Sequence, residues 1–206
     1  SGAPSGEVIS AGDCAQVAKA ALAVQLRTPP TQCNFIPLLD QAPPALCAAG
    51  TTPSVFFHDE FESGEAWMDR WTVSRTEVHP GEFTPRDWTV VGDLPHGRSG
   101  SAFWAPDPNI GACSASGVDN QAGVLHLYSK VISVAKPAKG ARIAFDHSVA
   151  TEAGWDGGNL SISVNGGAWQ PVKAVDFLYN DYNRTLYTAG QGSDNPLAGQ
   201  PAFSGA

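Results

Sequence analysis

Apolar positions between residues 14 and 26 recur every three to four residues, which predicts an amphipathic helix of about four turns. Ser10 and Asp13 precede this pattern in the form of a capping box, whose side chains satisfy free amides of the first turn. Pro29 and Pro30 follow it and would end the helix. We therefore expect residues 1–28 to be a helical segment, the tail of a preceding domain, and the proline-rich residues 29–53 to be a linker.

From residue 54 onward the pattern is that of short β-strands separated by turn-forming residues. Asn165 and Gly166 predict a tight hairpin turn, because both central positions of such a turn need a positive φ. The strand signal fades after residue 179, and any further closing strands would lie beyond residue 206. The fold class expected is mainly β: an antiparallel, jelly-roll-like β-sandwich over residues 54–206, preceded by one short α-helix and the linker. The expected strands lie at residues 55–57, 71–73, 88–91, 101–104, 124–128, 130–134, 142–149 and 160–164, with a hairpin partner beginning at residue 168.

Charge and hydropathy narrow the range of partners. The chain carries a formal net charge of −8, and its 12 basic residues are scattered without a run of three, whereas nucleic-acid binding needs a clustered basic surface. The sequence contains no apolar stretch of the length needed to span a bilayer. We expect a monomer that neither binds nucleic acid nor spans a membrane.

The four cysteines bear on the cellular compartment. Cys33 and Cys47 would close a short proline-rich loop and form the preferred disulfide, while Cys14 and Cys113 stay unassigned. No cysteine pair or histidine has the spacing of a structural zinc site. Disulfides persist in oxidising compartments, so we expect a secreted, extracellular protein.

The densest acidic cluster, Asp59, Glu60 and Glu62, stands at the end of the first expected strand of the sandwich. Carboxylates at such a position suit calcium, a hard cation that takes six to eight oxygen ligands, so other loops would have to contribute. Asp107 and Asp119 are the best remote ligands. A structural calcium ion would stabilise the folded state, and chelation with EDTA should then lower the melting temperature. The alternative is a solvated acidic strand end.

A second candidate site is the turn that contains Glu152, Trp155 and Asp156. Here a sugar or a peptide could stack on the indole and bond to the two carboxylates. The alternative is a tight turn in which Asp156 bonds to local backbone amides. The other tryptophans lie in strand-like contexts typical of a core, at positions 67, 71, 88, 104 and 169.

Motifs of known catalytic sites are missing from the sequence: it has no HExxH, GxSxG or P-loop. A pair of carboxylates among the 20 acidic residues could still serve glycoside hydrolysis, which needs only two. We expect no catalytic residue in this chain.

Two stretches resemble parts of secreted bacterial zinc metallopeptidases of the fungalysin type. Residues 145–169, with Trp155-Asp-Gly-Gly-Asn159, look like the region downstream of the catalytic domain, and residues 9–20 are similar to the last helix of that domain. Residues 56–64 fit the same region and also resemble the opening of MAM-type jelly-roll domains. The MAM likeness implies that Asp59 and Glu62 help to bind a cation. The zinc-binding helix of the peptidase is absent, so hydrolytic activity is not implied.

The resemblance implies a noncatalytic accessory module of a secreted metallopeptidase, which binds the protein or polysaccharide substrate, anchors the enzyme or stabilises it. Three alternatives remain open: a carbohydrate-binding module of a secreted enzyme, a small glycan hydrolase or lyase, and a cell-surface adhesion domain. An HExxH motif encoded upstream of residue 1 would identify a metallopeptidase parent.

Overall fold

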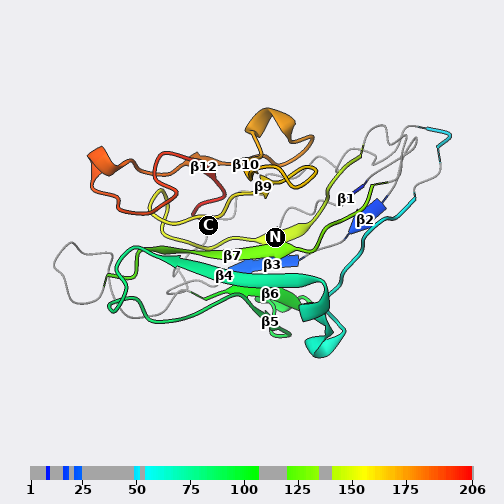
Figure 1. Cartoon of the computed structure of the whole chain (residues 1–206), viewed down its shortest axis with the longest axis horizontal. Helices are drawn as coiled ribbons and strands as arrows, with labels where there is room; N and C mark the ends of the chain where they lie inside the picture. The colour runs from blue at the N-terminus through cyan, green and yellow to red at the C-terminus, as the bar shows by residue number, and fades with distance from the viewer. Residues whose placement is uncertain are drawn as a thin grey trace.

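The computed structural model describes residues 8–9, 16–18, 21–24, 49–51, 54–106, 120–134 and 141–205, and these are built mainly of short strands (Figure 1). The strands of the first half are β1 (Val8–Ile9), β2 (Gln16–Ala18), β3 (Ala21–Val24), β4 (Trp71–Glu77), β5 (Thr89–Val91), β6 (Ala102–Ala105) and β7 (Gly123–Ser129). Those that follow are β8 (Asp146–Ser148), β9 (Ser161–Ile162), β10 (Gln170–Pro171), β11 (Arg184–Thr185) and β12 (Pro201–Ala202). The helical elements of the described residues are short 3₁₀ helices, η1 (Gly64–Asp69), η2 (Pro95–Gly97), η3 (Ala174–Asp176) and η4 (Ala189–Gln191).

The prediction of a helix near the N-terminus is wrong for the residues of that segment that the structure describes. Residues 16–18 form β2, and residues 21–24 form β3, which lies between β6 and β8 and runs parallel to both. A short apolar run such as Ala-Leu-Ala-Val fits a buried strand as well as a helix, and periodicity alone cannot separate the two. Hydrogen bonding to two neighbouring strands, which sequence does not show, decides for the strand.

Most strand pairs are antiparallel, as expected, and they form small separate sheets. The largest has the order β5-β6-β3-β8, with β5 antiparallel to β6. The longest pair is β4–β7, a ribbon in continuous register from Trp71 opposite Ser129 to Glu77 opposite Gly123. The expected strands at residues 71–73, 88–91, 101–104 and 124–128 are thus confirmed with small shifts of their ends.

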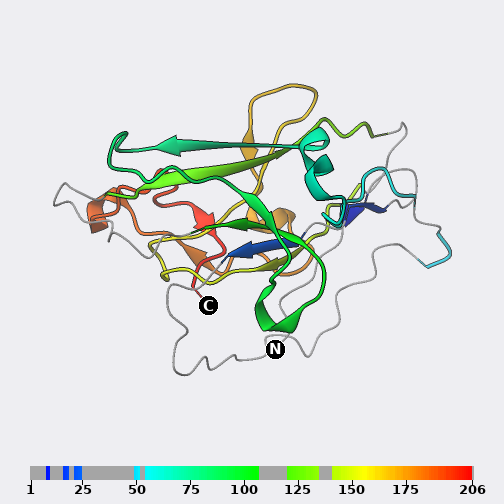
Figure 2. The ribbon, with the colours of Figure 1, turned by 90° about the horizontal axis from the view of Figure 1, so that it is seen from below.

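Aromatic side chains join the β4–β7 ribbon to β6. The ring of Trp71 lies 5.7 Å from that of Phe103, which is fully buried, and Phe61 packs against Phe103 at 4.8 Å. Trp67 of η1 contacts the same phenylalanine at 5.1 Å. Figure 2 shows the ribbon apart from the blue strand β3, with a green strand drawn between them.

Two apolar segments that were expected to be strands are not strands. Residues 55–57 and 130–134 have no ladder partner, but Phe56, Phe57 and Ile132 pack against the buried Ala144. Phe56, Phe57 and Ile132 thus pack in a loop-built cluster rather than a sheet, whereas Val55, Val131 and Val134 of the same segments are exposed. The expected strand over 142–149 is shorter in the structure. Residues 146–148 pair with β3 and form β8.

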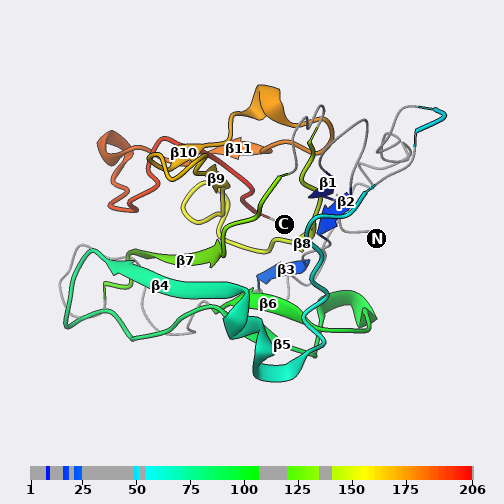
Figure 3. The same cartoon turned by 45° about the vertical axis from the view of Figure 1, so that its right-hand side comes forward.

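The C-terminal region carries more structure than its Asn- and Gly-rich sequence indicates. The hairpin turn predicted at Asn165 and Gly166 is confirmed, with φ values of 54° and 73°, and it joins β9 to β10. Beyond residue 179, β11 pairs with β12, and Phe203 packs against His147 at 4.3 Å. β9, β10 and β11 lie on one side of the β4–β7 ribbon, whereas β5 and β6 lie on the other (Figure 3).

Within the described ranges, no helix has both the length and the apolar character needed to cross a bilayer.

Candidate functional site

The Asp59 carboxylate is buried and holds together the acidic segment 59–62, which follows a loop rather than the expected strand. It accepts hydrogen bonds from the backbone amide of Phe61 at 3.0 Å and from the indole Nε1 of Trp71 at 2.8 Å. Nη1 of Arg70 lies 3.3 Å from its second oxygen. Phe61 has a positive φ of 60°, which is unusual for a bulky residue, and the bond to Asp59 holds its backbone there. Asp59 therefore has a structural role.

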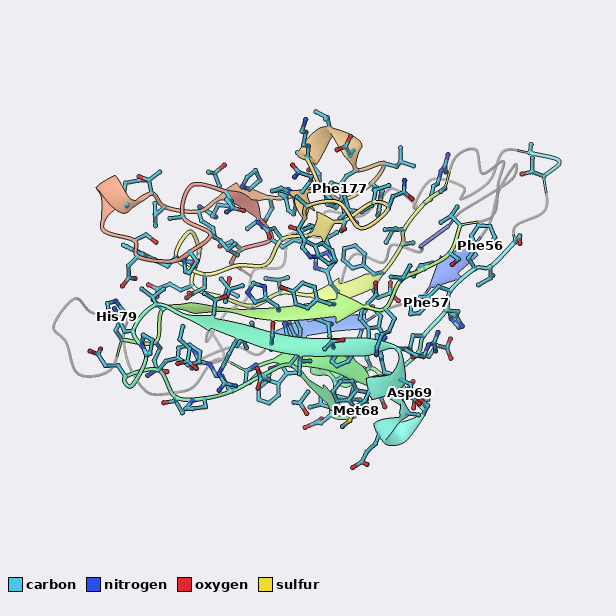
Figure 4. All side chains as sticks on the ribbon, viewed as in Figure 1. Phe56, Phe57, Met68, Asp69, His79 and Phe177 are labelled. Carbon is cyan, nitrogen blue, oxygen red and sulfur yellow. The ribbon has the colours of Figure 1, made fainter. Side chains whose placement is uncertain are left out.

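Arg70 packs against the outer side of this acidic segment. Its second guanidinium nitrogen, Nη2, donates to the carbonyl oxygen of His58, and its guanidinium group lies over the ring of Phe57, 4.5 Å from the centroid. Met68 and Asp69 project from η1 nearby, whereas His79 lies at the far end of β4 (Figure 4). A cation bound at Asp59 would compete with the positive charge of Arg70.

The two glutamates of the same cluster point to different partners. The Glu60 side chain is exposed and lies 3.4 Å from Nε2 of His58. Glu62 accepts hydrogen bonds from the backbone amide of Ser101 at 2.6 Å and from its hydroxyl group at 3.3 Å. These bonds connect the residue before β6 to the acidic segment. The structure thus brings Asp59 and Glu62 into one region but gives each carboxylate protein partners.

The other two candidate metal ligands and all four cysteines fall outside the described residues. They are Asp107 and Asp119, and Cys14, Cys33, Cys47 and Cys113. Within the described part of the chain, no three His, Cys, Asp or Glu side chains gather closely enough to hold a metal ion. Calcium binding and the Cys33–Cys47 bond stay predictions.

The second candidate, at residues 152–156, is a tight turn. The backbone amides of Trp155 and Asp156 donate to the carbonyl oxygen of Glu152 at 3.1 and 3.0 Å. The Trp155 ring packs edge-on against Tyr187 at 4.9 Å, and the Glu152 side chain is exposed. The three residues are brought together as expected, but backbone bonds and a ring contact account for the arrangement. Ligand binding at this turn stays a prediction.

A different site emerges on the β4–β7 ribbon. Because side chains alternate along a strand and directly opposite residues share a face, one face of the ribbon carries the even-numbered residues of both strands. On β4 these are Thr72, Ser74 and Thr76, all exposed. On β7 they are Val124, His126 and Tyr128, all partly buried. We call these six positions the open face.

Two rings of the open face and one ring from a neighbouring hairpin form a continuous row. The rings of His126 and Tyr128 lie 5.6 Å apart with an angle of 18° between their planes. Trp169, from the turn between β9 and β10, lies 5.2 Å from Tyr128 and is 51% exposed. We call His126, Tyr128 and Trp169 the aromatic row. It brings together strands that are far apart in the sequence.

The expectation that Trp169 lies in a core is wrong. The residue lies just before the two-residue strand β10, in a hairpin whose opposite face carries the exposed Ile162. Such a hairpin is too short to bury both faces. The available sequence signal was the closeness of Trp169 to the Asn165–Gly166 turn, since loop tips lie at the surface.

The surroundings of His126 favour its neutral form. Burial lowers the pKa of this histidine, and its Nε2 atom lies 3.0 Å from the hydroxyl oxygen of Thr76. The ring therefore presents a neutral imidazole whose other nitrogen can donate or accept a hydrogen bond.

The open face bears no formal charge, although charged residues occur on the same strand. Arg75 and Glu77 belong to the opposite face of β4, where Nε of Arg75 lies 2.7 Å from Oε1 of Glu77. Nη1 of the same arginine pairs with Asp87 at 2.8 Å. The strand thus separates an ion-paired face from a neutral face of hydroxyl groups and aromatic rings. Such a combination suits a neutral, hydroxyl-bearing ligand.

Comparison of the chain with models of protein families, with curated proteins and with solved structures finds no match in any of the three.

Proposed function

We propose that this chain is a noncatalytic accessory module of a secreted bacterial enzyme and that it holds a polymeric substrate of that enzyme on the open face. The observation that carries this proposal is the row of short, exposed side chains, Thr72, Ser74 and Thr76, beside the half-buried aromatic residues of β7. Short side chains leave room for a ligand to lie along the strands, and the partly buried rings provide rigid contact surfaces with little conformational entropy to lose.

A binding role fits the carboxylates better than catalysis does. Asp59 and Glu62 hold backbone and indole groups in place, so these two acidic residues already have a structural function. General acid–base chemistry needs carboxylates placed beside a substrate, and these two are committed to the protein itself.

The parent enzyme is proposed to be a zinc metallopeptidase, with the described strands forming part of a jelly-roll-like sandwich. The resemblance of residues 145–169 and 56–64 to the region after a fungalysin-type catalytic domain supports this parent. The packing of Trp71 of β4 against Phe103 of β6 supports a sandwich, since side-chain contacts between two sheets are what a sandwich core requires. A reading frame that encodes HExxH upstream of residue 1 is the expected finding.

Cosedimentation of the purified chain with insoluble polymers tests the binding role. Casein aggregates, cellulose, xylan and chitin serve as the polymers, and at least one of them should retain the chain without being hydrolysed. Thr72→Arg should weaken retention about tenfold, because a long cationic side chain would cover Tyr128. Thr185→Arg, which changes an exposed threonine on β11, is the matched control and should bind normally.

Two results would contradict the proposal. One is that no polymer retains the chain; the other is that the chain alone hydrolyses any of them.

A further inference from the structure

We propose that the ligand of the open face is an uncharged polysaccharide, whose sugar rings lie on the aromatic row and whose hydroxyl groups bond to β4 and His126. This inference rests on the proposed function and names the class of polymer that the face selects. Three features of the face support it: the rings, the hydrogen-bonding groups and the charge.

The rings provide a continuous apolar strip of the kind that the C–H faces of a sugar pack against. Tyr128 stands in the middle, 5.6 Å from His126 and 5.2 Å from Trp169, so no polar side chain interrupts the row. Tyr128 and His126 are fixed in a seven-residue strand that is paired along its whole length. Trp169 is the most exposed of the three, at 51%, and is therefore the ring most open to a ligand.

Hydrogen-bonding groups lie beside the strip on β4 and also within it, at the imidazole of His126. Thr72 is directly opposite Tyr128, and Ser74 is directly opposite His126. Each hydroxyl group can donate one hydrogen bond and accept others, which matches the dual character of sugar hydroxyls. Thr76 bonds to His126 at 3.0 Å and so orients the imidazole ring. An apolar strip with a few placed polar groups is the usual composition of a small-molecule binding surface.

Charge separates the possible polymers. The six positions of the open face lack Lys, Arg, Asp and Glu, and the chain as a whole carries −8. An acidic polysaccharide would find no cationic partner here and would be repelled by the overall field. A peptide bound by strand addition would pair with the backbone at an edge of the two-stranded ribbon, and such binding would not use the side chains of the open face. Both observations favour a neutral glycan.

Isothermal titration calorimetry with soluble oligosaccharides tests the inference. Cellohexaose, xylohexaose and chitohexaose are the neutral probes, polygalacturonate is the acidic probe, and soluble casein is the protein probe. At least one neutral hexasaccharide should bind and change the tryptophan fluorescence, while polygalacturonate should not bind. Trp169→Ala should weaken binding about tenfold, the usual loss when one stacked aromatic ring is removed.

Trp155→Ala is the matched control, because this tryptophan is partly exposed and packs on a tyrosine, Tyr187, outside the open face. It should bind the hexasaccharide normally. Ser74→Asp is a second variant that leaves all three rings in place but puts a negative charge beside His126, and it should also weaken binding. Thermal melts of each variant verify that the protein is folded.

The outcomes distinguish this inference from the proposed function. Binding that is lost in Trp155→Ala but kept in Trp169→Ala would overturn the assignment to the aromatic row. A second outcome is that the chain binds casein and no hexasaccharide, and that Thr72→Arg abolishes the casein binding. This would contradict the assignment of a glycan ligand but would leave the open face as a binding surface. Failure of every probe and every insoluble polymer would sink both proposals.

Discussion

The indole of Trp71 donates a 2.8 Å hydrogen bond to the carboxylate of Asp59, which stands twelve residues earlier in the chain. The same carboxylate fixes the backbone of Phe61 in the left-handed region, and Phe61 and Trp71 both pack against Phe103. One buried acid thus joins the start of β4, a strained turn and the aromatic core. The conspicuous acidic sequence at this point is explained in part by the needs of the fold.

Asp59→Asn should destabilise the protein by about 2 kcal/mol, because the amide keeps the side-chain shape but loses the charge that Arg70 and Trp71 are arranged around. Urea unfolding at pH 7 measures the change. Glu60→Gln is the control: its side chain is exposed and its ion-pair partner among the described residues is His58, so we expect a loss of about 0.5 kcal/mol or less.

The same experiment in calcium and in EDTA separates the two possible roles of Asp59. The contacts with Arg70 and Trp71 act equally in both buffers. A calcium ion held by Asp59 would add stability to the wild type only when calcium is present, and the substitution would remove that addition. If Asp59→Asn is as stable as the wild type in EDTA, the contacts contribute nothing and the structural account of Asp59 is wrong.

The strands that form the open face were predictable, because they carry their own signal. Residues 71–73 and 124–128 are rich in β-branched and aromatic side chains, and the pairing of two long strands stabilises that pattern. The hairpin turn was predictable too, since Asn165 and Gly166 adopt the positive φ that favours these residue types. Local chemistry decides both features.

Features that depend on distant partners were not predictable. The Ala21–Val24 run is a strand because β6 and β8 flank it, and no local property distinguishes it from a helix. Trp155 and Trp169 show the same limit for the site. The first occupies a turn yet packs on Tyr187, and the second precedes a strand yet is half exposed. Exposure depends on what covers a ring, and the sequence of that ring's own segment does not show it.

The stability of the protein should fall as the pH decreases from about 6.5 to about 4, through His147. This histidine is buried against Phe203, and its Nδ1 atom has no hydrogen-bond partner among the described residues. Burial, and secondarily the positive charge of Arg98, lowers the pKa of His147 from 6.5 to about 4. Below pH 6.5 the unfolded chain therefore takes up a proton that the folded protein refuses, which costs about 3 kcal/mol of stability by pH 4.

Carboxylates titrate in the same range, so the contribution of His147 must be measured by difference. His147→Leu removes the titrating ring and keeps an apolar side chain against Phe203. Urea unfolding of both proteins at several pH values from 7 to 4 should show a steeper loss of stability in the wild type. Parallel pH profiles would mean that His147 does not resist protonation in the folded state.

Two adjacent glycines should respond very differently to substitution by alanine, because residues 202–204 leave no room for a Cβ atom at only one of them. A Cβ atom on Gly157 would lie 2.6 Å from the carbonyl oxygen of Phe203 and 3.1 Å from the Cβ atoms of Ala202 and Ser204, whereas a Cβ atom on Gly158 would meet no atom within 4 Å. Gly157→Ala should therefore cost about 2 kcal/mol, the usual penalty for overpacking a close contact, and Gly158→Ala only a few tenths of a kcal/mol.

Gly158 and Phe203 exchange two backbone hydrogen bonds, of 3.0 and 2.8 Å. Hydrogen exchange at the Phe203 amide should accordingly quicken in Gly157→Ala and stay slow in Gly158→Ala. Equal stability of the two variants, with unchanged exchange at residue 203, would show that the C-terminal strand does not pack against this turn.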